Sequence, residues 1–205
     1  MLHQIRVRLA DRPGSLGRVT WVLGALGVDI RQVVVLGRES GRAVDEFTVE
    51  LPGGVSRERL VDTLEDVPGV VVQGVWRTST VPGTASDVAM LGQIAAAPAR
   101  GLAILVDAAP RLFGADWAAL LSSDGAVVYG SVAAPAQLDV PEPLRARAYE
   151  SGDLKCAMAP LGQDGVLVLA RTEAPGFHVA ELDRLIQLVD ATAVVLAGRP
   201  VTADS

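Results

Sequence analysis

The chain is poor in several residue types, and each shortage excludes a class of site. Its 205 residues include one cysteine and two histidines. Cys156 alone excludes intrachain disulfides and zinc sites built from several thiolates, which is typical of a reducing compartment. His3 and His178 are too few and too far apart in the sequence to indicate a metal centre. We therefore expect no metal site and no cofactor.

Long apolar runs are also missing. No stretch reaches the roughly 20 apolar residues that a membrane helix needs, because Arg, Asp, Pro or Gly interrupts the segments rich in Ala and Val. The first residues alternate at once, without the basic stretch, apolar run and cleavage site of a signal peptide. These patterns predict a cytoplasmic protein that does not contact the membrane.

The charge is acidic overall and unevenly distributed. Eighteen Lys and Arg side chains against 24 Asp and Glu give a net charge of −6, and 50% of the residues are hydrophobic. Residues 1–77 carry as many acidic as basic side chains, so the whole excess lies in residues 78–205. The imbalance predicts a globular chain of two modules, and the lack of a basic stripe argues against nucleic acid as a partner.

Catalytic motifs are absent as well. The sequence contains no G-x-S-x-G, G-x-G-x-x-G or Walker pattern. Asp107, Asp124 and Asp164 remain as general-base candidates, and each is more simply a loop or cap residue. We therefore expect a protein that is not an enzyme and has no catalytic residues.

The first module shows alternating strands and amphipathic helices in a definite order. The pattern predicts a strand at 5–9, a helix at 16–26 that ends at Gly27, strands at 28–36 and 44–51 around a turn at 37–41, a helix at 56–67 and a strand at 70–77. The order βαββαβ predicts an α+β, ferredoxin-like fold, with two helices on one face of a four-stranded antiparallel sheet.

Two motifs in this module carry a family resemblance. The first is Asp11-Arg12-Pro13-Gly14-Ser15-Leu16, and the second, after a helix, is Leu26-Gly27-Val28-Asp29-Ile30. Together they resemble an ACT domain over about residues 3–77. This resemblance implies a regulatory module that binds an amino acid or related effector between paired copies. It places the amino-acid-binding residues in a ligand loop, residues 11–16, and in a counter-wall, residues 28–30.

The local chemistry of the ligand loop agrees with that implication. A helix that starts near Pro13 leaves backbone N–H groups unpaired and carries a partial positive charge, which suits an α-carboxylate. Gly14 permits close approach, and Asp11 or Asp29 would accept the α-ammonium group. Pairing of two copies would bring Asp29 of one towards the loop of the other. The alternative is that Asp11 only caps the helix and the Pro-Gly turn binds nothing.

The second module follows a linker at 78–87, covers residues 88–198 and leaves a tail at 199–205. The expected elements are helices at 90–95 and 102–112, strands at 117–121 and 126–132 joined at Asp124-Gly125, a short helix at 141–150, a hairpin of 154–161 and 165–172 around Gln163-Asp164, and a helix from 177.

This order, with the segments 112–120 and 159–169, resembles a compact GAF-type sensor domain. The resemblance implies a small-molecule sensor or a dimerising domain with an antiparallel sheet. No cyclic-nucleotide signature is present, and Cys156 lies in an apolar strand, so we interpret it as a buried core thiol and not as a bilin attachment site. The alternative is that the outer helices, near 88–97 and 178–197, form a dimer bundle.

These observations lead to one functional expectation and one rival. We expect a non-catalytic homodimeric regulatory protein whose ACT-like domain binds an amino acid at a dimer interface and relays occupancy through the GAF-like domain. The small-molecule effector is then the main partner, and a regulatory protein partner is a further possibility. The rival is a ligand-free dimerisation scaffold for a signalling or transcription partner.

Overall fold

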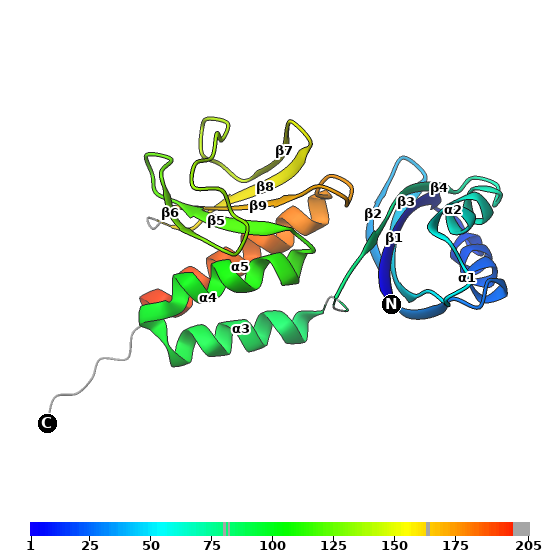
Figure 1. Cartoon of the computed structure of the whole chain (residues 1–205), viewed down its shortest axis with the longest axis horizontal. Coiled ribbons are helices and arrows are strands. Elements are labelled where there is room, and N and C mark those ends of the chain that lie inside the picture. The colour runs from blue at the N-terminus through cyan, green and yellow to red at the C-terminus, as the bar shows by residue number, and fades with distance from the viewer. Residues whose placement is uncertain (80, 82, 163–164, 199–205) are drawn as a thin grey trace, which may run out of the picture. The chain divides into compact units, whose positions relative to one another are not determined.

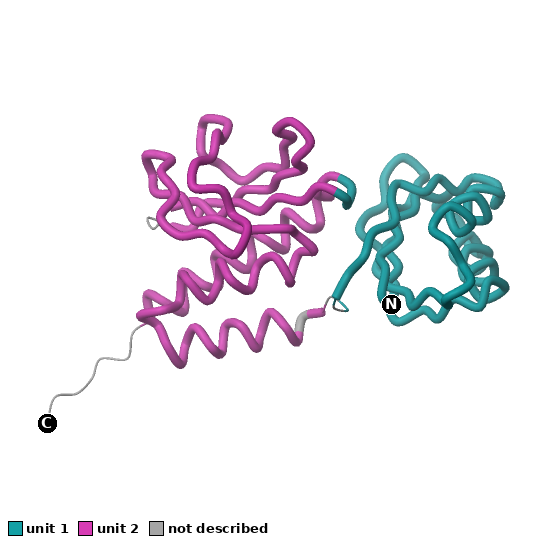
Figure 2. The backbone as a smooth tube through the Cα atoms, in the orientation of Figure 1, with its two compact units in different colours: residues 1–81, 173–175 teal, residues 82–172, 176–205 magenta. Residues whose placement is uncertain are grey.

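The computed structural model describes residues 1–79, 81, 83–162 and 165–198. It contains two compact units, Met1–Val81 with Glu173–Pro175 and Pro82–Thr172 with Gly176–Ser205 (Figure 2). The helices and strands are β1 (Leu2–Ala10), α1 (Ser15–Ala25), β2 (Asp29–Glu39), β3 (Arg42–Glu50), α2 (Arg57–Glu65), β4 (Val71–Arg77), α3 (Thr84–Ala96), η1 (Pro98–Arg100), α4 (Gly101–Phe113), β5 (Trp117–Leu121), β6 (Val127–Gly130), β7 (Arg147–Ser151), β8 (Leu154–Pro160), β9 (Val166–Arg171) and α5 (Val179–Ala197).

The first unit has the predicted α+β, ferredoxin-like architecture. Its antiparallel sheet has the order β2-β3-β1-β4, and α1 and α2 lie on the same side of it (Figure 1). Alternate residues of each strand enter one apolar core between the sheet and the helices. The fully buried members of this core include Ile5, Val7, Val19, Leu23, Phe47, Val49, Leu60 and Leu64.

Local signals set the ends of both helices. Gly14 precedes α1 with φ of 84°, a left-handed conformation that favours glycine. Gly27 follows α1 with φ of 72°, and the next N–H, that of Val28, donates to the Leu23 carbonyl, which closes the helix as predicted. Ser56 caps α2 because its side chain accepts a hydrogen bond from the Arg59 N–H.

The turn between β2 and β3 is shorter than the predicted 37–41. β2 continues to Glu39, and only Ser40 and Gly41 form the turn, with φ of 52° and 73°. A two-residue hairpin turn with both residues at positive φ matches the twist of the flanking strands. The pairing of β2 with β3 changes register between Val35 and Gly37, so the strand passes through Gly37 and does not stop there.

The second unit is built on an antiparallel sheet of order β6-β5-β9-β8-β7. α4 and α5 pack on one face of this sheet, and α3 packs against both helices (Figure 1). The apolar core between helices and sheet includes Ile94, Leu105, Val106, Leu120, Leu167, Leu169 and Leu185. A second apolar cluster on the other face of the sheet is covered by the segment that joins β6 to β7, through Ala134, Leu138, Val140 and Leu144.

Two predictions for the second unit are wrong. Residues 141–150 form no helix, because 141–146 are irregular and β7 pairs with β8 across a turn at Gly152. Pro141 and Pro143 remove N–H donors, and each proline disfavours helical backbone in the residue before it. The first helix begins at Thr84, inside the predicted linker, and Asp87 in its first turn forms an ion pair of 2.6 Å with Arg184 of α5.

Other boundaries differ only slightly. β6 is shorter than the predicted 126–132, while Asp124-Gly125 forms the expected turn, with φ of 84° at Gly125. β8 and β9 pair as the predicted hairpin, and the turn residues Gln163-Asp164 lie outside the described residues. Residues 80, 82 and 199–205, which fall in the predicted linker and tail, also lie outside them.

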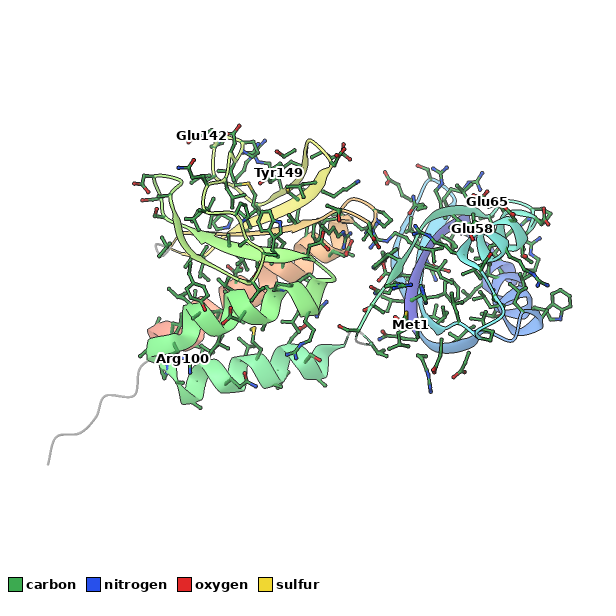
Figure 3. All side chains as sticks on the ribbon, viewed as in Figure 1. Met1, Glu58, Glu65, Arg100, Glu142 and Tyr149 are labelled. Atoms are coloured by element: carbon green, nitrogen blue, oxygen red, sulfur yellow. The ribbon has the colours of Figure 1, made fainter. Side chains whose placement is uncertain are left out.

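The single thiol is a core group, as predicted. Cys156 is 3% exposed on β8 and pairs across the ladder with Tyr149 of β7, which is labelled in Figure 3. Burial raises the pKa of the Cys156 thiol and also that of the Tyr149 hydroxyl. The thiol is therefore protonated at neutral pH and unsuited to covalent attachment chemistry.

Within the described residues, no single helix combines the length and the apolarity needed to cross a membrane. One pair of helical segments, Ala85–Ala96 and Pro98–Phe113, passes that test together on length and composition alone, with a bend of 115° between them.

Substitutions on α2 test the buried face of the first unit. Leu64 is fully buried, so Leu64→Ala should lower the free energy of unfolding by about 2–5 kcal/mol through lost burial and a residual cavity. Asp62→Ala, on the exposed face of the same helix, should change it by less than about 0.5 kcal/mol. Urea denaturation of the full chain measures both values, and equal effects would contradict this assignment of faces.

Candidate functional site

The ligand loop connects β1 to α1 through a tightly bonded turn. The Asp11 N–H donates to the Gly41 carbonyl at 2.9 Å, and the Ser15 N–H donates to the Arg12 carbonyl at 3.2 Å. The first helical hydrogen bond runs from the Arg18 N–H to the Gly14 carbonyl at 3.2 Å. The N–H groups of the two residues before Arg18 therefore point out of the helix end, where they can bind an anion.

Asp11 does not cap this helix. Gly14 occupies the N-cap position, and none of the described side chains forms a capping hydrogen bond there. The Asp11 carboxylate instead lies 3.7 Å from Nε of Arg38 and is partly exposed. The alternative in which Asp11 serves only as a cap is therefore wrong. Since residues 15–18 include no acid, the partial positive charge of the helix end is not offset within its first turn.

The loop residues differ in exposure. Asp11, Arg12, Pro13, Gly14 and Leu16 are exposed, whereas the first helical residue, Ser15, is 3% exposed. Its hydroxyl accepts a hydrogen bond from the Arg18 guanidinium at 3.5 Å. The loop thus offers exposed backbone donors above a buried polar side chain.

The counter-wall lies at the other end of the sheet. Asp29 pairs with Glu50, and Glu50 also pairs with Leu2 at the start of β1. The ligand loop leaves β1 after Ala10, about 26 Å further along at about 3.3 Å per residue. Asp29 and Leu2 both pair with Glu50, so Met1, labelled in Figure 3, marks this end of the sheet. One copy of the chain therefore does not bring the loop and the counter-wall together.

The counter-wall acid also has a partner of its own. Arg31 lies 3.3 Å from Asp29 through Nε and donates to Glu50 through Nη2 at 2.7 Å. This hydrogen bond with Arg31 lowers the pKa of Glu50. Val28 is buried and Ile30 packs against the core. Asp29 is thus the polar member of the counter-wall, and it shares Arg31 with Glu50.

The structure adds a residue that the sequence analysis missed. Asp45 on β3 alternates with the core residues Ala43 and Phe47, so its side chain points to the helix-covered face, and it is 2% exposed. Its Oδ1 has no hydrogen-bond partner among the residues that the structure describes. Burial raises its pKa, with Arg38 opposing this effect and Asp11 adding to it. In the sequence, position 45 falls on the same side of the alternating strand as the apolar positions 43, 47 and 49. This alternation is the signal that could have revealed a buried carboxylate.

The neighbouring acid provides a contrast. Glu46 faces the opposite side of the sheet and accepts two hydrogen bonds from Arg6, from Nε at 2.9 Å and from Nη2 at 2.6 Å. It also accepts one from Gln4, whose own amide oxygen accepts from Trp76 Nε1 at 3.0 Å. Adjacent residues of one strand thus carry one fully paired carboxylate and one that lacks a partner at Oδ1.

A hollow in the first unit lies away from the ligand loop. Its lining includes His3, Arg57, Trp76 and Arg77, near the start of β1 and the end of β4. Burial lowers the pKa of His3, which leaves its imidazole neutral at pH 7. This hollow contains none of the predicted site residues.

Comparison with known proteins identifies the class of the first unit. Residues 3–69 match the family model of the ACT domain, and this part of the chain is an ACT domain. An ACT domain indicates a regulatory role based on the binding of small molecules. A search of curated proteins gives no match to the chain.

Solved structures give further similarities. The ACT domain from GTP pyrophosphokinase of Chlorobium tepidum is 25% identical, with a TM-score of 0.31, and the alignment covers 35% of this chain and 94% of that one. A formyltetrahydrofolate deformylase from Pseudomonas putida KT2440 is 14% identical, with a TM-score of 0.32 and coverage of 47% and 39%. An unknown protein from Galdieria sulphuraria is 13% identical, with a TM-score of 0.35 and coverage of 97% and 92%.

Asp45 predicts an unusual effect of pH on stability. Its pKa is raised in the folded state, so the fold is favoured while Asp45 is protonated and loses that contribution as the pH rises through the folded pKa. Asp45→Asn should therefore raise the free energy of unfolding at pH 7, because a neutral amide replaces a buried carboxylate whose charged form burial disfavours.

Urea denaturation of both proteins across the pH range measures this difference. The gain from Asp45→Asn should shrink towards zero as the pH falls below the ordinary carboxyl pKa of about 3.9, because the carboxyl is then neutral in both the folded and the unfolded state. Asp62→Asn, at an exposed position of α2, serves as the control. Destabilisation by Asp45→Asn at pH 7 would show that the carboxylate is well paired.

Proposed function

We propose that the protein is a non-catalytic, homodimeric regulatory protein that binds an amino acid between the ligand loop of one copy and the counter-wall of the other. The observation that carries this proposal is the start of α1, where a helix end that none of the described side chains caps follows an exposed glycine and leaves backbone N–H groups free. Such an end attracts a carboxylate. The ACT family model makes a small-molecule effector the expected ligand class.

The edge of the sheet supports the homodimer. β2 has 11 residues and lies at the sheet edge, where it exposes Val33, Val34 and Val35 to 36%, 39% and 45%. A long apolar edge strand is a template for pairing with another chain. A two-fold symmetric dimer that pairs two β2 strands antiparallel would continue the sheet from one copy into the next.

This pairing would also complete the proposed site. Antiparallel pairing centred on Val34 sets Asp29 of the partner subunit opposite Glu39, because both lie five residues from the centre. Glu39 is at the end of the sheet from which the ligand loop emerges, since it pairs with Arg42 and Arg42 pairs with Ala10. In such a dimer, the counter-wall of the partner would therefore lie at the same end of the sheet as the ligand loop.

The second unit is proposed to relay occupancy as a GAF-like domain. Its antiparallel sheet carries helices on one face, and the segment joining β6 to β7 covers an apolar cluster on the other. Only residues 78–83 separate β4 of the ACT domain from α3. A change in the geometry of paired ACT domains would reach α3 through this short connection, to the extent that the effector binds one geometry more tightly than another.

No catalytic role is proposed for the acids that the sequence offered as general bases. Asp107 accepts a hydrogen bond from the Tyr129 hydroxyl at 3.0 Å. Asp124 accepts one from Ser122 Oγ at 2.5 Å, which lowers the pKa of Asp124. Both roles support local structure. Asp164 lies outside the described residues.

A ligand-free scaffold is the second candidate, and the helices of the second unit favour it. Val88 on α3 is 67% exposed, and Val179 and Val194 on α5 are 62% and 71% exposed. α3 and α5 pack against each other, so these helices present apolar side chains to a partner. In this case the helices form a dimer bundle or bind a regulatory protein, and the ligand loop stays empty.

Thermal denaturation of the full chain with each of the twenty amino acids tests effector binding. A ligand that binds only the folded state should raise the melting temperature by about 4 °C or more, which corresponds to about 1 kcal/mol for a chain of this size. Gly14→Ala should abolish the rise, because the added methyl group occupies the ligand's approach.

Gly125→Ala is a matched control for Gly14→Ala. Both glycines have φ of 84°, and no described atom lies within 4 Å of a Cβ built at either position. Both substitutions should therefore destabilise the protein similarly, by about 1–2 kcal/mol. Only Gly14→Ala should remove ligand binding. Absence of any amino-acid effect on the wild type would favour the scaffold.

Sedimentation velocity tests the edge-paired dimer. Val34→Lys should convert the dimer to a monomer, because pairing would bury a charged side chain from each copy at the centre of the interface. Val71→Lys, on the opposite edge strand β4, where Val71 is 41% exposed, should leave the dimer intact. If the Val34→Lys variant is still a dimer, the dimer interface does not lie at β2.

A further inference from the structure

We infer that Asp45 accepts the ammonium group of the bound amino acid, within the same copy whose helix end holds the carboxylate. This inference rests on the proposed function and names the acceptor in its site. Three carboxylates compete for the role. Asp11 lies beside Arg38, and Asp29 lies beside Arg31, whereas Oδ1 of Asp45 has no hydrogen-bond partner in the described part of the chain.

Register places Asp45 at the loop end of the sheet. It pairs with Val7 on β1, only three residues before Ala10, after which the ligand loop begins. Three residues of strand span about 10 Å. Asp29, by comparison, lies at the far end of β2 in the same copy, so Asp45 is the buried acid nearest to the loop along the sheet.

The side chain of Asp45 points towards the helix that the loop begins. Its strand neighbours on the same face, Ala43 and Phe47, are core residues. α1 packs against β1 and β2, so it spans β3 between them. The buried Ser15 starts this helix, so a buried hydroxyl on α1 and a buried carboxylate on β3 both lie on the helix-covered side of the sheet.

The charges around Asp45 leave one negative charge without a counter-ion. The charged groups that act on it are Arg38 and Asp11, which form an ion pair with each other at 3.7 Å. Arg38 contacts Asp11 and forms no ion pair with Asp45, so among the described residues the buried Asp45 carboxylate has no cation in contact with it. An ammonium group supplies the missing charge and the hydrogen-bond donors together.

The two halves of the site match an α-amino acid. The helix end favours a carboxylate, Asp45 favours an ammonium group, and an α-amino acid carries both on one carbon atom. The site therefore selects free amino acids over 2-hydroxy acids and N-acetylated amino acids, which keep the carboxylate and lack the positive charge. Ammonium binding also explains why Asp45 is buried with no described partner at Oδ1, since a binding site often retains groups that destabilise the protein when no ligand is bound.

Isothermal titration calorimetry on the full chain tests the inference, with the amino acid that gives the largest thermal shift in the wild type as probe. Its 2-hydroxy analogue is the probe that lacks the ammonium group. Asp45→Asn should weaken binding of the amino acid by about thirtyfold or more, as expected for loss of one partner of a buried charge pair. It should leave binding of the 2-hydroxy acid unchanged.

Asp62→Asn is the matched control, because it removes the same charge from an exposed position of α2 outside the proposed site, and it should weaken binding by less than about threefold. Equal affinity of wild type and Asp45→Asn for the amino acid would overturn the assignment to Asp45 and leave effector binding in place. A large loss with Asp29→Asn alone would also overturn it. If no amino acid binds the wild type, the proposed function itself fails.

Discussion

The pairing of β1 with β3 is the constraint on which the ACT domain depends. The two strands pair over their full length, from Leu2 with Glu50 to Ala10 with Arg42. This register sets the point at which the chain leaves the sheet to start α1, and it leaves β2 at the edge. It also fixes which residues of β3 face the helices. A shift by one residue would expose Phe47 and bury Glu46, so the core holds the register firmly.

The register separates the two ends of the domain chemically. Towards one end the ligand loop enters α1 and β3 carries the buried Asp45, and at the other end Asp29 and Glu50 share Arg31. The apolar edge strand β2 joins these ends. Because a two-fold axis across that strand reverses its direction, dimerisation and ligand binding would depend on the same residues, which is a simple physical basis for regulation.

Much of the fold was predictable because local chemistry marks its boundaries. Gly27 and Ser56 end and begin helices through backbone and side-chain hydrogen bonds that involve only a few neighbouring residues. The wrong predictions concern segments whose secondary structure depends on residues far away in the sequence. Residues 147–151 become a strand by pairing with β8, and the early first turn of α3 is joined to α5 by the ion pair of Asp87 with Arg184, 97 residues away. Such pairings leave no periodic signal in the segment itself.

The sequence by itself determined the βαββαβ order, the ligand loop and its glycine, because turn residues, helix caps and alternation act over short distances. Only the tertiary structure decided that the counter-wall lies at the opposite end of the sheet, that Asp11 does not cap α1, and that Asp45 is buried with no described residue bonded to its Oδ1. These outcomes depend on strand register and on the helix layer above it. A contact between residues far apart in the chain is fixed only when the core packs.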